Sequence, residues 1–81
     1  MNRDEVMDLV REHLVTELEL DREDVVREAR FKEDFDADSL DLYELVMELE
    51  DRYGITVSEK EASELSTVGD AVDFVLAKTG S

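Results

Sequence analysis

Apolar residues recur at three- and four-residue steps along this chain, and that spacing is the strongest constraint on its fold. Residues with this period line one face of an α-helix, and that face has to be buried against other elements. The first such set is Val6, Leu9, Val10, Leu14 and Leu18. It predicts a helix at about residues 3–18. A second helix is expected to begin at "DSLD", where Asp38 or Ser39 can cap it, and to run to about Tyr53, where Gly54 can supply the left-handed residue that ends it.

Two capping boxes predict further helix starts in the C-terminal part of the chain. In a capping box, a Ser or Thr side chain bonds the backbone N–H three residues on, and an acid there bonds back. Ser58 and Glu61 fit this pattern and open a short helix through Leu65, and Thr67 and Asp70 open the last helix. The apolar residues of that last helix are Val68, Ala71, Val72, Val75 and Leu76. The sequence therefore predicts an all-α fold with three longer helices and one short one.

The segment between the first two helices, residues 19–38, is less regular and predicts a long loop. One helical turn is expected near its start, with Val25 and Val26 pointing inward. Phe31 and Phe35 are expected to hold the rest of the loop against the core. Loops of this length are uncommon in small domains and usually have a function.

The net charge of −15, from 24 acids and 9 bases, limits the partners that the chain can bind. It argues against nucleic acid and against an anionic membrane surface, because both require cations on the protein. It favours partners with basic patches. With 81 residues and no Cys, we expect a single domain over residues 1–81, without disulfides. No apolar run approaches a membrane span and the N-terminus lacks a signal-peptide core, so we expect a cytoplasmic monomer that does not insert into membranes.

The stretch "DFDADSLDLYEL", residues 34–45, places Ser39 among five acids. A nucleophilic serine needs a base within hydrogen-bond reach, and acids around it would repel a developing oxyanion. The single histidine, His13, belongs to a different predicted helix, where we interpret it as an edge-of-core or surface residue. Neither a "GxSxG" nor an "SxxK" pattern is present. The sequence therefore predicts a serine that another protein modifies, in a chain that is not an enzyme.

The same stretch partly matches a calcium-binding EF-hand loop. Asp34, Asp36 and Asp38 fall at its first, third and fifth places. The sixth place holds Ser39 where the loop needs Gly, and the twelfth holds Leu45 where it needs a bidentate Glu. We therefore expect no specific metal site, while weak binding of divalent ions by the acids stays open.

The helix after Ser39 carries apolar residues on two faces. Its core side is expected to comprise Leu42, Leu45, Val46, Leu49 and Tyr53. Leu40 and Met47 point instead toward the side of the acids Glu44, Glu48 and Asp51. Acids with exposed Leu and Met among them are typical of a docking surface, where charge guides the partner and the apolar side chains adapt to it.

The stretch "DADSLDLYELVMELEDRYGI" resembles the modification-site region of acyl carrier proteins of the free-standing bacterial fatty-acid-synthesis type. "VVREARFKEDF" upstream and "VSEKEASELSTVGDAVDFV" downstream extend the resemblance over nearly the whole chain. It implies a four-helix bundle with a long first loop and a short third helix. It also implies that holo-acyl-carrier-protein synthase, a phosphopantetheinyl transferase, transfers 4′-phosphopantetheine from coenzyme A to Ser39. The thiol of that group would then carry the growing fatty acyl chain as a thioester.

The resemblance also assigns a docking face and a cavity. The face would meet basic patches on the synthase, on fatty acid synthesis enzymes and on acyltransferases. By position its residues are Asp38, Leu40, Asp41, Glu44, Met47, Glu50 and Asp51. The residues that would line the acyl-chain cavity are Val46, Leu49, Val57, Ala62, Leu65 and Ala71. From the sequence alone, a purely structural core role explains these six equally well.

Three positions depart from the family pattern. Asp36 replaces a Gly that can adopt a left-handed conformation, which Asp tolerates better than most residues. Tyr43 stands where a small aliphatic residue is common, and Ser58 replaces a common Pro. A carrier for polyketides or for another dedicated acyl or aminoacyl pathway remains an alternative, because its serine motif has the same spacing. Alternatives of another class are an acidic calcium-binding protein and an acidic decoy that occupies basic surfaces.

Overall fold

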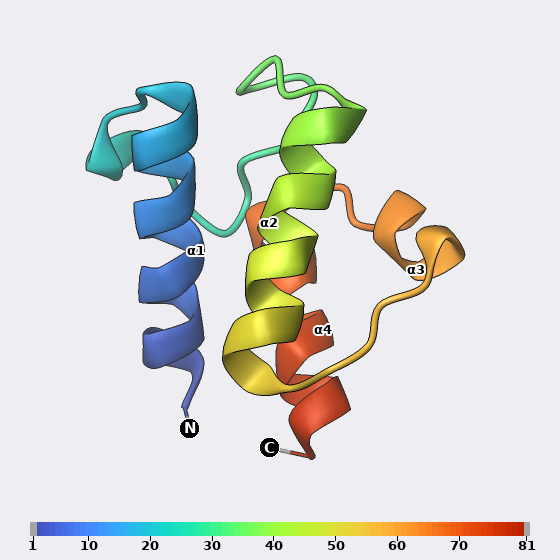
Figure 1. Ribbon diagram of the computed structural model, residues 1–81. Helices are drawn as coiled ribbons and strands as arrows, with labels where there is room; N and C mark the ends of the chain where they lie inside the picture. Colours follow the sequence, from blue (N-terminus) through green and yellow to red (C-terminus); the bar gives the residue numbers. More distant parts are fainter. Residues whose placement is uncertain (1, 81) are drawn as a thin grey trace.

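The computed structural model describes residues 2–80 and confirms the all-α prediction. The elements are α1 (Arg3–Leu18), the short 3₁₀ helix η1 (Arg22–Asp24), α2 (Ser39–Tyr53), α3 (Glu59–Ser63) and α4 (Val68–Thr79). The three longer helices pack together, and α3 lies to one side of α2 (Figure 1). In this part of the chain no helix is long and apolar enough to cross a membrane.

Each α-helix begins with a side-chain cap. Asn2 caps α1, and reciprocal capping boxes open the other three at Asp38, Ser58 and Thr67. Such caps satisfy backbone N–H groups that have no partner inside the helix and contribute about 1 kcal/mol each. The boxes at Ser58 and Thr67 were predicted, but α3 ends at Ser63, two residues before the predicted Leu65.

The apolar faces of α1, α2 and α4 meet in one core. The most completely buried large side chains are Leu45, Leu49, Val6, Val10, Val25, Val68, Val72 and Val75. Most of them belong to the predicted helical faces, which are therefore confirmed. Val26 corrects the prediction, because it was expected to point inward and is 45% exposed. The helical turn η1 ends at Asp24, so neither valine belongs to it; Val25 enters the core whereas Val26 points outward.

The long loop is attached to the start of α4 by backbone hydrogen bonds. The N–H of Phe31 donates to the carbonyl of Ser66 at 3.0 Å, and the N–H of Val68 donates to Ala29 at 3.0 Å. The N–H of Gly69 donates to the Arg27 carbonyl at 2.9 Å. A Cβ at Gly69 would lie 3.1 Å from that carbonyl oxygen, so glycine permits this close approach.

Side chains complete the attachment of the loop. Phe31 is only 2% exposed and Phe35 is half-buried, which confirms that both phenylalanines hold the loop against the core. The Arg27 guanidinium lies 3.0 Å from the Asp73 carboxylate on α4, and Arg3 of α1 pairs with the same carboxylate. These two partners, the Arg27 hydrogen bond first, hold the pKa of Asp73 below its ordinary value. The loop is therefore an ordered part of the fold.

Candidate functional site

Ser39 is the first residue of α2 and is exposed. The preceding residue, Asp38, caps the helix: its Oδ1 accepts the N–H of Asp41 at 3.0 Å, and Asp41 Oδ2 accepts the N–H of Asp38 at 3.2 Å. Within residues 2–80 the Ser39 hydroxyl has no hydrogen-bonding partner. Because Asp38 does the capping, the serine hydroxyl stays available for chemistry.

A tight turn in the long loop leads the chain to Ser39. The N–H of Ala37 donates to the Phe31 carbonyl at 2.9 Å, and the N–H of Asp36 donates to the Lys32 carbonyl at 3.1 Å. This turn requires a left-handed residue, and Asp36 has a φ of 53°. The Asp that replaces the family's Gly therefore does take the left-handed conformation. Ala37 is buried, so the turn is anchored next to the site.

No histidine lines the groove of Ser39 in the described part of the chain. His13 lies on α1 in a small pocket with Glu17 and, from α2, Glu48. It is half-buried, which agrees with the edge-of-core interpretation, and its Nε2 has no partner within residues 2–80. Ser39 does not line this pocket, so the nucleophile–base pair of a hydrolase is not formed there.

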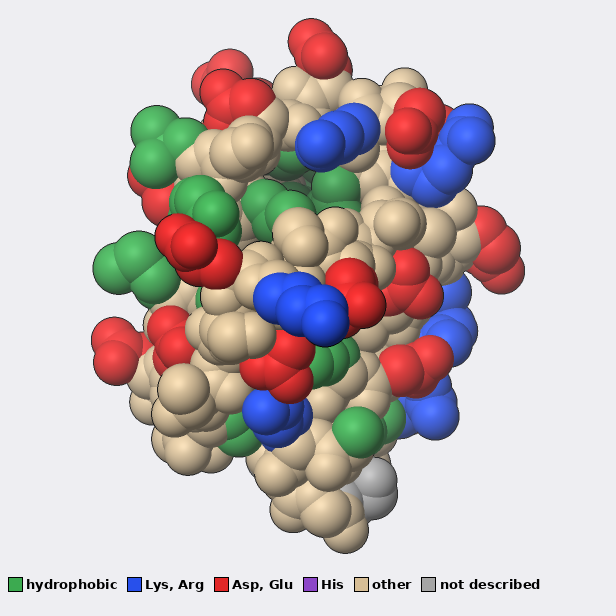
Figure 2. Space-filling view, turned by 90° about the vertical axis from the view of Figure 1, so that its right-hand side faces the viewer, with side chains coloured by type: hydrophobic (Ala, Val, Ile, Leu, Met, Phe, Trp, Pro, Cys, Tyr) green, Lys and Arg blue, Asp and Glu red, His purple; other side chains and the backbone are tan. Residues whose placement is uncertain are grey.

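Two neighbouring grooves lie beside Ser39, between α2 and α3. The smaller has a volume of about 110 Å³ and is lined by Lys32, Ser39, Leu42, Tyr43, Ala62, Ser63 and Leu65. The larger has a volume of about 420 Å³ and is lined by Leu40, Tyr43, Val46, Met47, Glu50, Val57, Ser58, Glu59 and Ala62. Tyr43 and Ala62 border both. Figure 2 shows a hollow with hydrophobic side chains on this side of the molecule, with a basic side chain at its edge.

The predicted cavity residues divide between these grooves and the core. Val46, Val57, Ala62 and Leu65 line one groove or the other. Leu49 and Ala71 line neither and are 2% and 0% exposed, so the structure places them in the core. Lys32, Leu42 and Ser63 line the smaller groove without having been predicted there. Lys32 belongs to no predicted helix, so the helical pattern does not place it; the turn at Asp36 brings it to the site.

The wall of the grooves on the α3 side is held in place by charge. Glu61 Oε2 lies 3.1 Å from the Nζ of Lys78 on α4, and Glu61 Oε1 accepts the N–H of Ser58 at 3.0 Å. The backbone hydrogen bond first, and then Lys78, lower the pKa of the Glu61 carboxyl. A helix of five residues is too short to be stable alone, so these contacts position it.

The predicted docking residues form an acidic face around two projecting apolar side chains. Leu40 and Met47 are 64% and 63% exposed, and Tyr43 beside them is 42% exposed. Glu44 and Asp51 are exposed as well. Figure 2 shows such hydrophobic side chains projecting between acidic ones along one edge of the molecule.

Three of the predicted docking acids also have structural roles. Asp38 and Asp41 form the capping box of α2. Glu50 faces the larger groove, where its Oε2 accepts the N–H of Val57 at 2.8 Å and so ties the chain after α2 back to the helix. A helical projection of the sequence cannot reveal this contact, because it depends on where the next segment lies.

The acids of the partial EF-hand match are used in other ways. Asp34 Oδ2 accepts the N–H of Arg30 at 2.7 Å, and Asp38 caps α2. Among residues 2–80, no three His, Cys, Asp or Glu side chains are arranged to hold a metal ion. The acids before Ser39 thus order the loop and the helix start.

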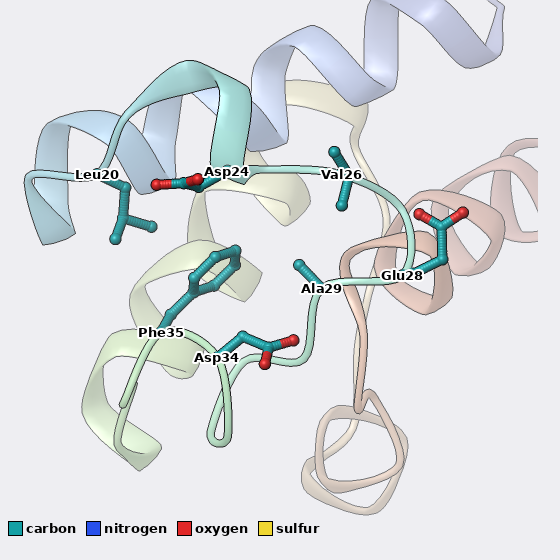
Figure 3. A pocket seen from close by; sticks show the side chains of 7 residues that line it. All are labelled: Leu20, Asp24, Val26, Glu28, Ala29, Asp34 and Phe35. Atoms are coloured by element: carbon teal, nitrogen blue, oxygen red, sulfur yellow. The ribbon is translucent and has the colours of Figure 1, made fainter.

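A further pocket, of about 360 Å³, lies within the long loop and does not include Ser39. Figure 3 shows its hydrophobic side chains with three carboxylates among them. Its lining residues are Leu20, Asp24, Val26, Glu28, Ala29, Asp34 and Phe35. Phe35 borders this open space, which explains why it is only half-buried while Phe31 is enclosed.

The comparisons with known proteins agree with this geometry. A family model described as "Phosphopantetheine attachment site" matches residues 8–75, which defines the class of carrier domain. The acyl carrier protein of Rubrobacter xylanophilus is 43% identical over 76 residues, covering 94% of each chain. That of Thermosynechococcus vestitus is 42% identical over 81 residues, the full length of both.

A solved structure of the acyl carrier protein from Enterococcus faecalis superposes with a TM-score of 0.83 at 33% identity, covering 96% of this chain and 99% of that one. The chain therefore belongs to the acyl carrier protein family. Members of this family are carriers rather than catalysts, and their prosthetic group is covalently attached 4′-phosphopantetheine. The resemblance stated from the sequence and the four-helix fold are both confirmed.

Proposed function

We propose that Ser39 is the attachment residue and that the chain carries fatty acyl groups for fatty acid synthesis in the cytoplasm, with residues 1–81 acting as one carrier domain. The observation that carries the proposal is the exposed Ser39 hydroxyl, without a partner in residues 2–80, at the mouth of an apolar groove. Ser58 and Ser63 differ, because their hydroxyls accept from Glu61 and donate to Lys60, respectively. Ser39 thus combines access, a free hydroxyl and an adjacent groove.

The largely apolar lining of the grooves beside Ser39 fits the chemistry of the prosthetic group and its acyl chain. When attached, the group supplies a terminal thiol that holds an acyl chain as a thioester. The walls of the larger groove, among them Val46, Val57 and Ala62, offer apolar contacts for the start of such a chain. Leu65 extends these walls into the smaller groove next to Ser39. We assign these four residues to acyl-chain binding and leave Leu49 and Ala71 to the core.

The partner surface in this proposal is the acidic face around Leu40 and Met47. Its acids attract proteins with basic patches, and the two projecting side chains offer apolar anchors within reach of Ser39. We propose that the synthase that modifies Ser39, the fatty acid synthesis enzymes and the acyltransferases all bind there. Tethering then raises the effective concentration of the acyl group at each partner's active site.

The attachment site is tested by intact mass. The apo chain is incubated with coenzyme A and a phosphopantetheinyl transferase, and we expect a single adduct on Ser39. Ser39→Ala should remain unmodified, while Ser66→Ala, which removes another exposed serine, should be modified like the wild type. A wild-type chain that takes up no adduct, or an adduct that persists in Ser39→Ala, would refute the assignment.

The pathway is tested separately, by the mass of the acyl groups on the protein isolated from its own cells. Saturated and 3-hydroxy fatty acyl groups of several lengths are expected for a carrier in fatty acid synthesis. Polyketide or aminoacyl groups alone would contradict this pathway and leave the carrier assignment intact.

A further inference from the structure

Lys32 is unusual among the basic residues of this acidic chain because no carboxylate pairs with it in residues 2–80. Six of the nine Lys and Arg residues form ion pairs: Arg3, Arg11, Arg22, Arg27, Arg30 and Lys78. Lys32, Arg52 and Lys60 form none within the described residues. Of these three, Lys32 alone lines the groove that contains Ser39.

The turn at Asp36 determines where Lys32 lies. The Lys32 carbonyl accepts the N–H of Asp36, and the adjacent Phe31 carbonyl accepts the N–H of Ala37. These bonds bring residues 31 and 32 alongside the segment that enters α2. The buried rings and methyl groups of Phe31 and Ala37 hold the turn in place, so Lys32 stays beside Ser39.

A cation near Ser39 matters because the neighbouring side chains are acidic. Asp36, Asp38 and Asp41 lie within three residues of the hydroxyl, and a phosphodiester on Ser39 would add a further negative charge. Asp38 and Asp41 each accept a backbone N–H group, and a carboxylate has no hydrogen to donate to a phosphate. A lysine ammonium donates up to three hydrogen bonds and binds a phosphate as a compact point charge.

We propose that Lys32 binds the phosphodiester formed at Ser39 and thereby directs the attached arm along the groove between α2 and α3. The inference rests on the proposed attachment at Ser39. Lys32 and Tyr43 line the same small groove, and Tyr43 also borders the larger one. Residues of α3 line both grooves, whereas Glu44 and Asp51 line neither, so an arm that follows these grooves from Lys32 would run beside α3.

The test compares how fast each lysine is acetylated in the apo chain and in the chain that carries phosphopantetheine. After the thiol has been blocked, both forms react with a limiting amount of acetylating reagent, and each site is quantified by peptide mass spectrometry. Loading should slow acetylation of Lys32 about threefold at low salt, because an ion-paired ammonium reacts more slowly. Lys60, which lines neither groove, is the internal control and should not change. At about 1 M salt the protection of Lys32 should shrink, because the charges are screened.

Failure of the inference and failure of the proposed function give different results. If Ser39 carries no adduct, the proposed function fails, and the inference fails with it before any lysine is measured. If Ser39 carries the adduct but Lys32 reacts equally fast in both forms, only the inference is overturned. Protection of Lys32 that persists unchanged at high salt also overturns it, because steric cover and not an ion pair then explains the result.

Charge variants supply a second measurement on folded protein, since Lys32 is exposed and its replacement removes no core contact. The quantity compared is the change in Tm on loading. The Tm of the loaded form minus that of the apo form should be about 2 °C lower for Lys32→Gln than for the wild type. Lys32→Arg keeps the charge and should behave like the wild type, as should Lys60→Gln. An equal change in Lys32→Gln and Lys60→Gln would overturn the proposal.

Discussion

Replacing Phe31 with Ala should detach the long loop from the bundle and cost much of the stability of the protein. Phe31 is 2% exposed, and truncation of a fully buried Phe costs about 3–5 kcal/mol. A domain of 81 residues is expected to have a free energy of unfolding of about 4–12 kcal/mol. One substitution in a loop would therefore remove about a quarter or more of the total.

Phe35→Ala is the matched control, because it deletes the same ring from the same loop. Phe35 is half-buried and borders the open loop pocket, so its loss leaves a smaller new cavity and should cost about 1–2 kcal/mol. Urea titrations at one fixed salt concentration give both values, and constant salt matters because the chain has a net charge of −15. At about 4–8 °C per kcal/mol, Tm should fall by about 12–40 °C for Phe31→Ala.

Hydrogen exchange identifies where the stability is lost. The N–H of Val68 donates to the Ala29 carbonyl of the loop, so its protection should drop in Phe31→Ala more than in Phe35→Ala. Equal losses for the two variants, or a loss below about 1 kcal/mol for Phe31→Ala, would refute the argument that burial of Phe31 anchors the loop.

Three further predictions concern single elements of the structure. Arg27 and Arg3 lower the pKa of Asp73, so the ionised carboxylate stabilises the fold fully above the ordinary pKa of 3.8, and this stabilisation is lost as the pH falls through the lowered pKa. Asp73→Asn should remove this part of the acid sensitivity, which amounts to at most about 1 kcal/mol because the ion pair is half-exposed. Urea titrations between about pH 2 and 6 measure the difference. Asp38→Ala should lower the free energy of unfolding by about 1 kcal/mol through loss of the α2 cap, and Asp38→Asn by much less, as measured by thermal unfolding. The double variant Leu40→Ala/Met47→Ala should reduce kcat/KM of the phosphopantetheinyl transferase about tenfold with unchanged Tm, because both side chains are exposed in the free protein.

Local patterns predicted most of this fold because they depend on residues close together in the chain. The caps at Ser58 and Thr67 involve contacts only three residues apart, so the sequence reveals them. The left-handed conformation of Asp36 was foreseen for a similar reason: the family's Gly at that position indicates the backbone geometry. The proposal that Ser39 is the attachment residue also rests on a local pattern, the motif around it.

Features that depend on distant segments were missed or misjudged. Val26 was expected to point inward as part of a helical turn, but η1 ends at Asp24 and Val26 is 45% exposed. Glu50 was assigned only to docking, although it binds the backbone of Val57 in a segment whose path the sequence does not specify. Lys32 had no predicted role, since only the folded turn brings it beside Ser39.

The arrangement of the bundle also matters for how the protein can be joined to other objects. Ser39 begins α2 at one end of the molecule, whereas the start of α1 and the end of α4 lie together at the opposite end (Figure 1). A tag, a fused protein or a solid support linked near residue 2 or residue 80 would therefore leave the Ser39 end accessible. The same polarity would let such a bundle serve as a module in the middle of a longer polypeptide, with Ser39 presented outward.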